Sequence, residues 1–469
     1  MPRDRTVLLA VVLGFAPSVA AQTSSPSVNT PDRTAATTQS LTVPVLPETP
    51  HNYANIELPD HYLLNRFPGN PPGQSSVIDT DNTPADNPTT DEGATLGRVL
   101  FYDIKLSANG TTSCASCHVQ ANGFSDPNVL SVGFAGETTR RHSMGLANAR
   151  FGAAGSFFWD ERAETLEDQV LMPFQDPAEM GLTLDELVSI VQSQPYYPGL
   201  FADAFGDPAV TTDRISRALA QFVRSIVSVT SRYDEGAELV ADPTQPFPNF
   251  TAQENLGKTL FFTPIPAGGA SCSACHVTES FVNPSNAPPG LTTSTNNGLD
   301  AVSTDDLGVA ETSLRAQDEG KFRVPSLKNI GVTQPYMHDG RLATLADVVE
   351  HYNSGIQPHP NLSPILQRAG GQPVRLNLSN QQRAALTAFL HTLTDTALLN
   401  DERYADPFVT ICSYADLAEP FGVLNIDDLD TWVDAFRAGD LLADCNADGT
   451  LNLDDLDCFI AAFLAGCDG

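Results

Sequence analysis

Two short segments of the chain place two cysteines and a histidine in the same order and at the same spacing. They are Cys114-Ala115-Ser116-Cys117-His118 and Cys272-Ser273-Ala274-Cys275-His276. This pattern is typical of c-type haem attachment, because both thiols can bond to the haem vinyl groups while the histidine reaches the iron. A lone Cys-x-x-Cys could be a disulfide, a redox motif or half a zinc site, but no second cysteine pair lies close enough to complete a local zinc knuckle. We expect two covalently bound haem c groups, attached through Cys114, Cys117, Cys272 and Cys275, with His118 and His276 as iron ligands.

A similar segment precedes each motif, which indicates an internal duplication. Leu96-Gly97-Arg98-Val99-Leu100-Phe101-Tyr102 comes before the first motif and Leu256-Gly257-Lys258-Thr259-Leu260-Phe261-Phe262 before the second. The spacing of about 160 residues is too long for a solenoid repeat and suits two tandem domains. Each half closes with an apolar pattern of helical period, over residues 213–227 and 379–393. The expected N-caps are Thr212 or Asp213 for the first helix and Ser379 for the second.

Three segments between and after the motifs resemble the bacterial di-haem cytochrome c peroxidase and MauG family. They are the run from Phe157 to Met180, Val324-Pro325-Ser326-Leu327-Lys328-Asn329-Ile330, and Pro335-Tyr336-Met337-His338-Asp339-Gly340. The resemblance spans residues 96–393. It implies two cytochrome c-like domains, in which the N-terminal haem is the peroxide site and the C-terminal haem relays electrons from a donor.

The resemblance also implies roles for three side chains near the first haem. Trp159 matches the tryptophan between the two haems, and Gln169 and Glu179 match the family's distal glutamine and glutamate. Heterolysis of an O–O bond needs a base that takes one proton and returns it to the leaving oxygen, together with a dipole that holds the peroxide. We therefore expect Glu179 to act as acid and base, Gln169 to orient the peroxide, and Trp159 to couple the haems.

The loop that holds a gating histidine in many family members departs from that pattern here. Alignment of residues 130–136 with this loop puts Phe134 at the histidine position, and the loop contains no histidine. The first haem is therefore expected to rest open and five-coordinate. His142 is the nearby alternative ligand, but it aligns with an asparagine that helps to bind calcium between the family's domains. Thr333 and Pro335 match the carbonyl donors of that site, yet imidazole is a poor ligand for a hard cation, which puts this calcium in doubt.

The sixth ligand of the second haem is a further departure. The peroxidases have a methionine at the position that Tyr352 occupies here, and Tyr352 matches MauG-like members. His351 and Met337 are the alternatives. A phenolate ligand would stabilise ferric iron and lower the reduction potential, whereas methionine raises it. Tyr352 is the preferred candidate.

The tail of the chain has the pattern of an EF-hand-type calcium loop. The run 444–455 places oxygen-bearing side chains at the ligand positions and glycine at position 6. An earlier copy over 416–430 lacks several of these oxygens. The tail resembles a dockerin-like module, which implies two calcium loops, each followed by a short helix, used for docking. Three disulfide pairings are formally possible, and the module favours Cys412 with Cys467 and Cys445 with Cys458. The expected calcium ligands are Asp444, Asn446, Asp448, Thr450, Asn452 and Asp455.

Composition and the N-terminus bear on the compartment. Residues 1–21 have two arginines, a short apolar run and small residues at the end, which is typical of a secretory signal peptide. No later stretch reaches 18 apolar residues, so we do not expect a transmembrane protein. The formal charge of −32 argues against nucleic acid and is compatible with a basic electron donor. The mature protein is expected to be periplasmic or otherwise exported.

The sequence thus predicts a mainly α chain: two tandem cytochrome c-like haem domains and a small α-helical EF-hand or dockerin-like module. The favoured function is reduction of hydrogen peroxide with electrons from a small cytochrome c, a cupredoxin, or an organic or protein reductant. A MauG-like oxidase acting on a protein or organic substrate and a non-catalytic electron carrier are the alternatives. A docking partner for the tail is also expected. The expected boundaries are a signal peptide (1–21), a flexible Pro/Thr-rich arm (22–90), the peroxidatic haem domain (91–240), the electron-transfer haem domain (241–405) and the dockerin-like module (406–469).

Overall fold

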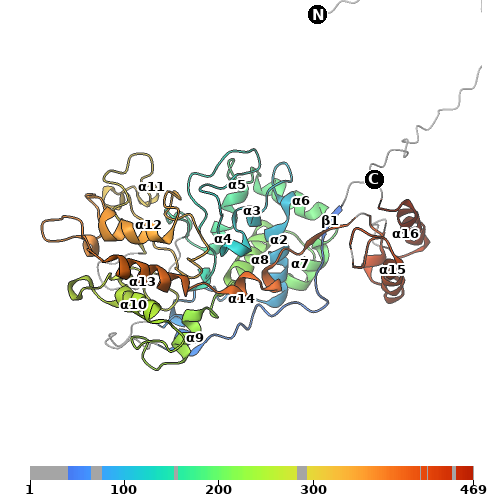
Figure 1. Cartoon of the computed structure of the whole chain (residues 1–469). Helices are drawn as coiled ribbons and strands as arrows, with labels where there is room; N and C mark the ends of the chain where they lie inside the picture. Colours follow the sequence, from blue (N-terminus) through green and yellow to red (C-terminus); the bar gives the residue numbers. More distant parts are fainter. Residues whose placement is uncertain are drawn as a thin grey trace, which may run out of the picture.

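The structure is a computed structural model that describes residues 41–64, 76–152, 157–282, 293–411, 413–419, 421–445 and 450–467. The predicted signal peptide and residues 22–40 of the predicted arm lie outside the described residues. Within the described part of the chain, helices dominate and the four strands are short (Figure 1). The expectation of a mainly α chain is confirmed.

Two helical bodies lie side by side, and each is built around a pair of long helices (Figure 1). In the first body α2 (Asp91–Tyr102) packs on α8 (Thr212–Ser225). In the second body α10 (Ala252–Phe262) packs on α13 (Asn380–His391). Helices α8 and α13 are the two that the apolar pattern predicted.

The helix N-caps agree with the sequence in one body and differ by one residue in the other. Ser379 caps α13 as predicted, because its hydroxyl accepts a hydrogen bond from the backbone N–H of Gln382 at 3.2 Å. The cap of α8 is Thr211 instead of Thr212 or Asp213, with its hydroxyl on the N–H of Arg214 at 3.2 Å. Thr211 and Thr212 are adjacent threonines, so the residue type alone could not choose between them.

The duplicated Leu-Gly segments supply the close contact in both helix pairs. A Cβ atom on Gly97 would lie 2.1 Å from the carbonyl oxygen of Ala218, and one on Gly257 would lie 1.9 Å from that of Ala385. No real Cβ atom tolerates such a distance, so glycine is what lets the two backbones meet. The internal repeat therefore has a structural cause, the crossing of α2 on α8 and of α10 on α13.

Short elements complete the two bodies. In the first body these are η1 (Ile78–Thr80), η2 (Ile104–Leu106), α3 (Cys114–Cys117), η3 (Gln120–Asn122), η4 (Ala149–Phe151), α4 (Leu166–Gln169), α5 (Met172–Gln175), α6 (Leu184–Ser193) and α7 (Tyr197–Phe205). In the second body they are α9 (Arg232–Glu238), η5 (Ile265–Ala267), η6 (Cys272–Ala274), β2 (Ser294–Thr295), α11 (Ala310–Ser313), η7 (Ala316–Asp318), β3 (Phe322–Arg323), α12 (Leu345–Glu350), the π-helical turn η8 (His351–Gly355) and η9 (Pro364–Leu366). Strands β2 and β3 pair antiparallel.

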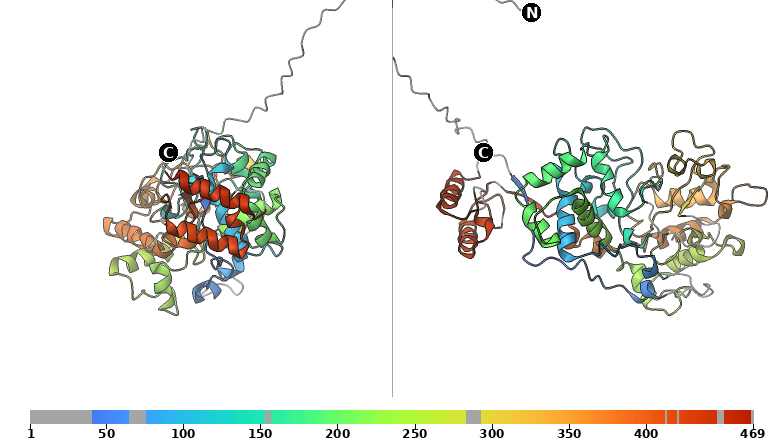
Figure 2. Two further views of the ribbon diagram at one scale, coloured as in Figure 1. Left: turned by 90° about the vertical axis from the view of Figure 1, so that its right-hand side faces the viewer. Right: turned by 180° about the vertical axis from the view of Figure 1, so that it is seen from behind.

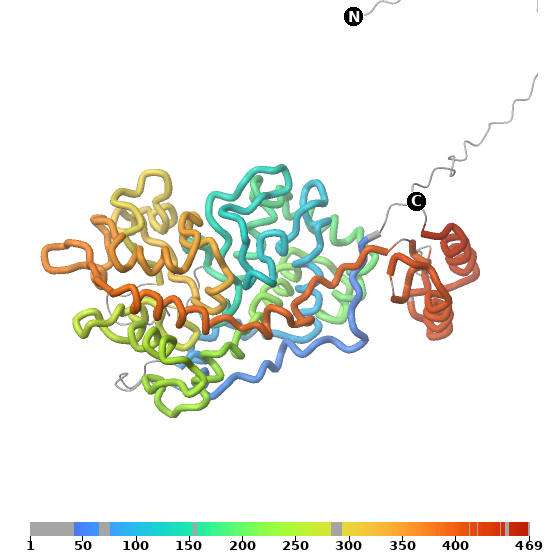
Figure 3. The backbone as a smooth tube through the Cα atoms, in the orientation of Figure 1, coloured from blue at the N-terminus to red at the C-terminus, as the bar shows by residue number. Residues whose placement is uncertain are grey.

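An N-terminal strap, residues 41–64, runs along both bodies (Figure 3). Its strand β1 (Leu41–Pro44) pairs antiparallel with β4 (Phe408–Ile411), and its helix α1 (Asp60–Leu63) lies on α9. Tyr53 and Tyr62 of the strap are buried. The described residues of the predicted flexible arm are therefore packed structure, because these aromatic side chains fill gaps on the bodies.

After α13 the chain returns across the first body through α14 (Thr396–Leu399), η10 (Glu402–Tyr404) and β4. Leu398 and Tyr404 belong to the apolar core of the first body. The hydroxyl of Tyr404 donates to the carbonyl of Ser225 at 2.6 Å. Residues 396–405 were assigned by sequence to the second domain and residues 406–411 to the dockerin-like module, but Leu398 and Tyr404 pack in the first body.

The tail forms a small unit that stands at one end of the molecule (Figure 2). Helices α15 (Ile426–Ala438) and α16 (Leu453–Ala465) lie side by side, with η11 (Leu441–Ala443) between them in sequence. The ring of Trp432 stacks on that of Phe459 with centroids 4.8 Å apart. None of the described helices is long and apolar enough to cross a membrane.

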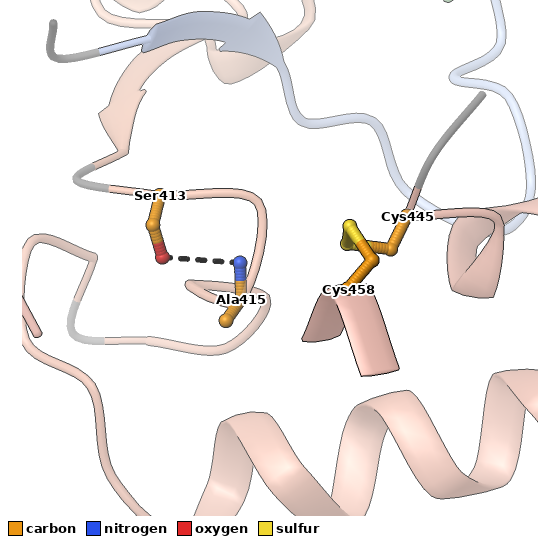
Figure 4. The surroundings of a disulfide bond; sticks show 4 residues. All are labelled: Ser413, Ala415, Cys445 and Cys458. Atoms are coloured by element: carbon orange, nitrogen blue, oxygen red, sulfur yellow. Dashed lines mark hydrogen bonds between the residues drawn. A yellow bond between two sulfur atoms is a disulfide. The ribbon is translucent and has the colours of Figure 1, made fainter. Parts of the chain in front are cut away.

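A disulfide joins Cys445 to Cys458 in the tail, as the sequence predicted (Figure 4). Cys467 also forms a disulfide. Its expected partner, Cys412, lies outside the described residues. The pairing of Cys412 with Cys467 therefore stays a prediction.

Candidate functional site

The first cavity lies in the first body and brings together the side chains that the sequence singled out. It is lined by Cys114, Cys117 and His118 of the first motif, and also by Trp159, Gln169 and Glu179. Helix α3 presents the motif because Ser113 and Ser116 form a capping box, with the Ser113 N–H donating to the Ser116 hydroxyl at 3.0 Å. None of the four motif cysteines forms a disulfide, so all four are available for thioether bonds to haem.

The histidines of both motifs are oriented for iron. Nδ1 of His118 lies 2.8 Å from the carbonyl oxygen of Phe124, and Nδ1 of His276 lies 3.3 Å from that of Phe281. A backbone carbonyl accepts from the protonated nitrogen and so leaves Nε2 as the lone-pair donor, which is the usual arrangement of an iron ligand. Burial lowers the pKa of His118, and it lowers that of His276 to about 4, which keeps both rings neutral. Two cysteines outside any disulfide, a neutral imidazole and an apolar cavity together fit haem c at each motif.

Glu179 has the ionisation of an acid–base group. Burial, followed by the neighbouring carboxylate of Asp176, raises the pKa of Glu179 to about 7. The turn that holds it is closed by a hydrogen bond from the Glu179 N–H to the Asp176 carbonyl at 3.0 Å. A carboxyl with this pKa can both accept and donate a proton near neutral pH. Gln169, the last residue of α4, lines the same cavity.

Phe134 does not enter the first cavity. Its ring packs on the backbone of Gly181, where an added Cβ would lie 2.4 Å from the ring. Its N–H donates to the carbonyl of Glu179 at 3.0 Å, and a Cβ on Gly133 would lie 1.9 Å from the carbonyl oxygen of Ala178. The loop 130–136 is thus held against the Glu179 turn, with the Phe134 ring packed on Gly181 and not among the residues that line the cavity.

Trp159 lies between the two motifs. It lines the first cavity and also a second cavity, which contains the motif residues Cys272, Cys275 and His276. Its indole N–H donates to the carbonyl of His142 at 2.8 Å, and its own carbonyl accepts from the N–H of Arg323 at 2.8 Å. The ring centroid lies 6.5 Å from that of His338. These contacts fix the indole at the junction of the two bodies.

The second cavity is lined by Cys272, Cys275 and His276 together with two of the three candidate sixth ligands, Tyr352 and Met337. The third candidate is absent from the lining: Nε2 of His351 lies 3.1 Å from the carbonyl of Asn297. The π-helical turn η8 carries both His351 and Tyr352, and such turns often occur at functional sites. Burial raises the pKa of Tyr352.

His142, which aligns with a ligand of the expected inter-domain calcium, makes hydrogen bonds to neighbouring protein groups. The ring nitrogens of His142 lie 3.2 Å from the Ser125 hydroxyl and 3.2 Å from the Val129 carbonyl. The ring also faces the backbone of Thr333, one of the two expected carbonyl donors; the other is Pro335. Among the described residues, no group of three or more His, Cys, Asp or Glu side chains could hold a metal ion. These residues do not fit a calcium ion.

The calcium loop of the tail is described only in part, because Asn446 and Asp448 lie outside the described residues. Of its other members, Asn452 and Asp455 form the capping box of α16, and the Asn452 N–H donates to Asp455 at 2.8 Å. The carboxylate of Asp428 in the earlier copy accepts from the N–H groups of Leu417 and Ala418, at 2.7 and 2.8 Å. Asp444 and Thr450 flank the undescribed residues.

One half-buried side chain of the site was not found from the sequence. Arg323 lines both cavities, and its guanidinium carbon lies 4.9 Å from the ring centre of Phe157. Burial lowers the pKa of Arg323 to about 10, so the side chain remains a cation at neutral pH. The available signal was its position directly before Val324-Pro325, the start of a segment that matched the family.

Comparison with known proteins agrees with this geometry. A family model described as di-haem cytochrome c peroxidase matches residues 91–239. The methylamine utilization protein MauG of Methylorubrum extorquens is 34% identical over 314 residues, which cover 66% of this chain and 80% of that protein. The chain belongs to the di-haem cytochrome c peroxidase and MauG family.

Both branches of the di-haem peroxidase and MauG family are represented among the relatives. Cytochrome c551 peroxidase of Nitrosomonas europaea is 33% identical over 264 residues, which cover 56% of this chain and 73% of that protein. The crystal structure of a MauG-like protein associated with microbial copper homeostasis aligns with a TM-score of 0.60 and 32% identity, covering 71% of this chain and 98% of that chain. Membership makes this chain a peroxidase-like oxidoreductase with two haem c groups.

Proposed function

We propose that this chain is an exported di-haem enzyme that reduces hydrogen peroxide in the first cavity. The observation that carries the proposal is Glu179, a carboxyl with a pKa of about 7 in the same cavity as Gln169 and His118. Cleavage of peroxide needs one group that removes a proton and returns it to the departing oxygen. A surface carboxylate with an ordinary pKa would hold too little of the acid form at neutral pH for the second task.

Each side chain of the first cavity has a separate task in this proposal. Glu179 takes the proton of the near peroxide oxygen and delivers it to the far one, and the Gln169 amide orients the peroxide by hydrogen bonding. Bound haem c supplies the redox chemistry at its iron. The loop 130–136 contributes no histidine and its Phe134 ring stays outside the cavity, which favours a first site that needs no prior activation.

The electrons for peroxide are proposed to come through the second haem site. Trp159 lines both cavities and is held by the carbonyl of His142, so it is an aromatic side chain placed to couple them. A small cytochrome c, a cupredoxin, or an organic or protein reductant would supply them. The acidic charge of −32 favours a donor with a basic surface.

Glu179→Gln tests the proposal. The amide keeps the size of the side chain but cannot take a proton, so we expect the rate constant for reaction with peroxide to fall about a hundredfold or more. The haem absorption spectrum should stay unchanged. The matched control is Glu164→Gln, the same substitution at an exposed position of the same segment, which should react like the parent protein. An equal rate in Glu179→Gln and the parent would refute the assignment.

The same experiment has a pH dependence with a defined sign. The base form of Glu179 becomes the major form as pH rises through about 7, so the rate constant of the parent protein should rise through that range. In Glu179→Gln this rise should be missing. Stopped-flow absorbance between pH 5 and pH 9 measures both profiles, and an identical rise in the variant would assign the titration to another group.

A MauG-like oxidation of a protein or organic substrate is the second candidate. The supporting observation is that Tyr352 lines the second cavity together with His276. A low-potential tyrosinate-ligated iron would accept electrons poorly from a high-potential donor. Peroxide-dependent oxidation of reduced cytochrome c or cupredoxin supports the peroxidase; consumption of peroxide with neither donor oxidised supports the MauG-like enzyme.

We further propose that residues 1–21 direct export and that residues 406–469 form a calcium-binding, dockerin-like module with its own docking partner. Helices α15 and α16 support the second part, because they begin with equivalent capping boxes, Asn425 with Asp428 and Asn452 with Asp455. Calcium titration of the full chain by calorimetry tests the module. An N-terminus beginning near residue 22 in protein from the culture medium or periplasm tests export.

A further inference from the structure

Two tyrosines share one buried carboxylate beside the first haem motif. The hydroxyl of Tyr196 donates to Oδ2 of Asp103 at 2.7 Å, and that of Tyr197 donates to the same atom at 2.8 Å. The centroids of the two rings lie 4.7 Å apart. Asp103 and Tyr197 are 1% and 0% exposed, respectively. The peroxide chemistry proposed above uses none of the three.

This Tyr–Asp–Tyr cluster extends from the haem motif to the surface. Burial raises the pKa of Tyr197 most, followed by Asp103 and Tyr196, and Cys114, a haem attachment residue, adds the smallest contribution. Cys114 packs against the same apolar core as Tyr197. Tyr196 is half-buried, with the ammonium of Lys105 5.1 Å from its ring centre and the ring of Phe408 at 6.0 Å. The inner ring thus packs in the core that borders the haem motif, and the outer ring is partly exposed.

The hydrogen-bond partner is what separates these tyrosines from their neighbours. A phenol that loses an electron becomes a strong acid, so oxidation is easy only where a base can take the proton at once. A carboxylate is such a base, whereas a backbone carbonyl is not. Tyr53, Tyr102 and Tyr404 of the same core donate to backbone carbonyls, each at 2.6 Å. Tyr196 and Tyr197 alone among these five have a carboxylate partner.

We propose that Tyr197, Asp103 and Tyr196 form a proton-coupled path that passes single electrons from a small aromatic reductant, such as a hydroquinone, at the surface to the first haem site. The path rests on the proposed peroxide reduction, which consumes the electrons. It gives this enzyme an electron entry that bypasses the second haem and Trp159.

The steps balance at every stage. Tyr197 gives up one electron toward the first site, and its hydroxyl proton moves to Asp103. Tyr196 then gives one electron to Tyr197, while Asp103 returns its proton to Tyr197 and takes that of Tyr196. The hydroquinone gives one electron to Tyr196, which recovers the proton from Asp103, and the hydroquinone releases its own proton to water. Two such passages deliver the two electrons that convert one hydrogen peroxide, with two protons from water, to two molecules of water.

Freeze-quench electron paramagnetic resonance of the full-length holoenzyme tests the path. One equivalent of hydrogen peroxide is added without a donor to the parent protein, Tyr197→Phe, Tyr196→Phe and the control Tyr404→Phe. We expect a tyrosyl radical in the parent and in Tyr404→Phe, and its loss in Tyr197→Phe. In Tyr196→Phe the radical should persist on Tyr197 and should resist quenching by hydroquinone. A radical that is absent from the parent or unchanged in Tyr197→Phe overturns the path.

Failure of the path can be told apart from failure of the peroxide reaction. The optical change of the first haem on adding peroxide reports the reaction itself and should occur in all four proteins. If the optical change is missing from the parent protein, both the proposed function and the path are refuted. If the optical change occurs but the radical signal is the same in Tyr197→Phe as in the parent, only the proposed path is refuted. Mass spectrometry after repeated peroxide addition gives a second readout: oxidation should collect on Tyr196 in the parent, and an even spread over the tyrosines contradicts the path.

Discussion

Tyr352 and Met337 both line the second cavity, and one amide lies near both. The Nδ2 of Asn297 lies 3.4 Å from Sδ of Met337, and the same side chain hydrogen-bonds Tyr352. Only one of the two can be the sixth ligand, and the ligand sets the potential: a thioether favours ferrous iron and a phenolate favours ferric iron. The choice between peroxidase and MauG-like chemistry therefore depends on one side chain.

Replacement of that side chain gives a sharp prediction. If Tyr352 binds the iron, Tyr352→Met should raise the midpoint potential of the second haem by on the order of 0.1 V or more, a part of the roughly 0.8 V that axial ligands span. Spectroelectrochemistry measures it. The matched pair is Tyr352→Phe and Tyr336→Phe, because Tyr336 lines the same cavity but donates to the carbonyl of Ile330 at 2.9 Å. A shift in Met337→Leu and none in Tyr352→Phe would assign Met337 instead.

At the scale of elements, the repeated glycines fix how the long helices cross. Gly97→Ala should lower the free energy of unfolding by about 1–3 kcal/mol, since the new methyl group would press on the backbone of Ala218. The control is Gly199→Ala in α7, where a Cβ would meet nothing within 4 Å; it should leave the free energy unchanged or raise it by at most about 1 kcal/mol. Urea unfolding measures both. Equal free energies of unfolding for the two variants would mean that α2 and α8 can move apart to accept the added methyl group without loss of stability.

The elements also show how far the sequence could lead. Helices α8 and α13 were predicted because a long amphipathic pattern and a cap lie within one continuous segment. The side chains of the first cavity were predicted from short motifs, and the cavity does contain Trp159, Gln169 and Glu179 together. The strand pairing of the strap and the burial of Tyr53 were not predicted, because β1 pairs with β4 from the far end of the chain and Tyr53 lies in a Pro- and Asn-rich stretch without apolar periodicity. Two strands that pair across most of the chain leave no local pattern in the sequence that could predict the pairing.

Across the whole molecule, a buried ionic cluster fastens the strap to the second body. Asp234 of α9 contacts His61 of the strap at 2.9 Å and Lys328 at 2.5 Å. Burial alone would raise the pKa of Asp234, but Lys328 and His61 outweigh it and lower the pKa to about 2. The folded pKa is below the ordinary 3.8, so this stabilisation is complete above about pH 4 and is lost as pH falls toward 2.

Lys328→Met should therefore cost about 3–5 kcal/mol at neutral pH, because it leaves a buried carboxylate without its cation. The control Lys321→Met removes the same group from a more exposed pair with Asp318 at 2.9 Å and should cost at most about 1 kcal/mol. Thermal unfolding at pH 7 ranks the two. If Lys321→Met proved as costly as Lys328→Met, burial of the Asp234 cluster would not be the source of the effect.

The tail tests whether catalysis and docking are separate functions of one chain. Helices α15 and α16 pack on each other around Trp432, whereas β4, just before them, belongs to the strap pairing. We expect deletion of residues 412–469 to leave peroxide turnover unchanged, because every side chain of the first cavity remains in place. Deletion of residues 406–469 should also retain turnover, but it removes the partner of β1, and hydrogen exchange should then quicken across residues 41–44. Loss of peroxide turnover on deletion of residues 412–469 would mean that the tail supports the haem bodies directly. That result would contradict a separate docking role for the tail.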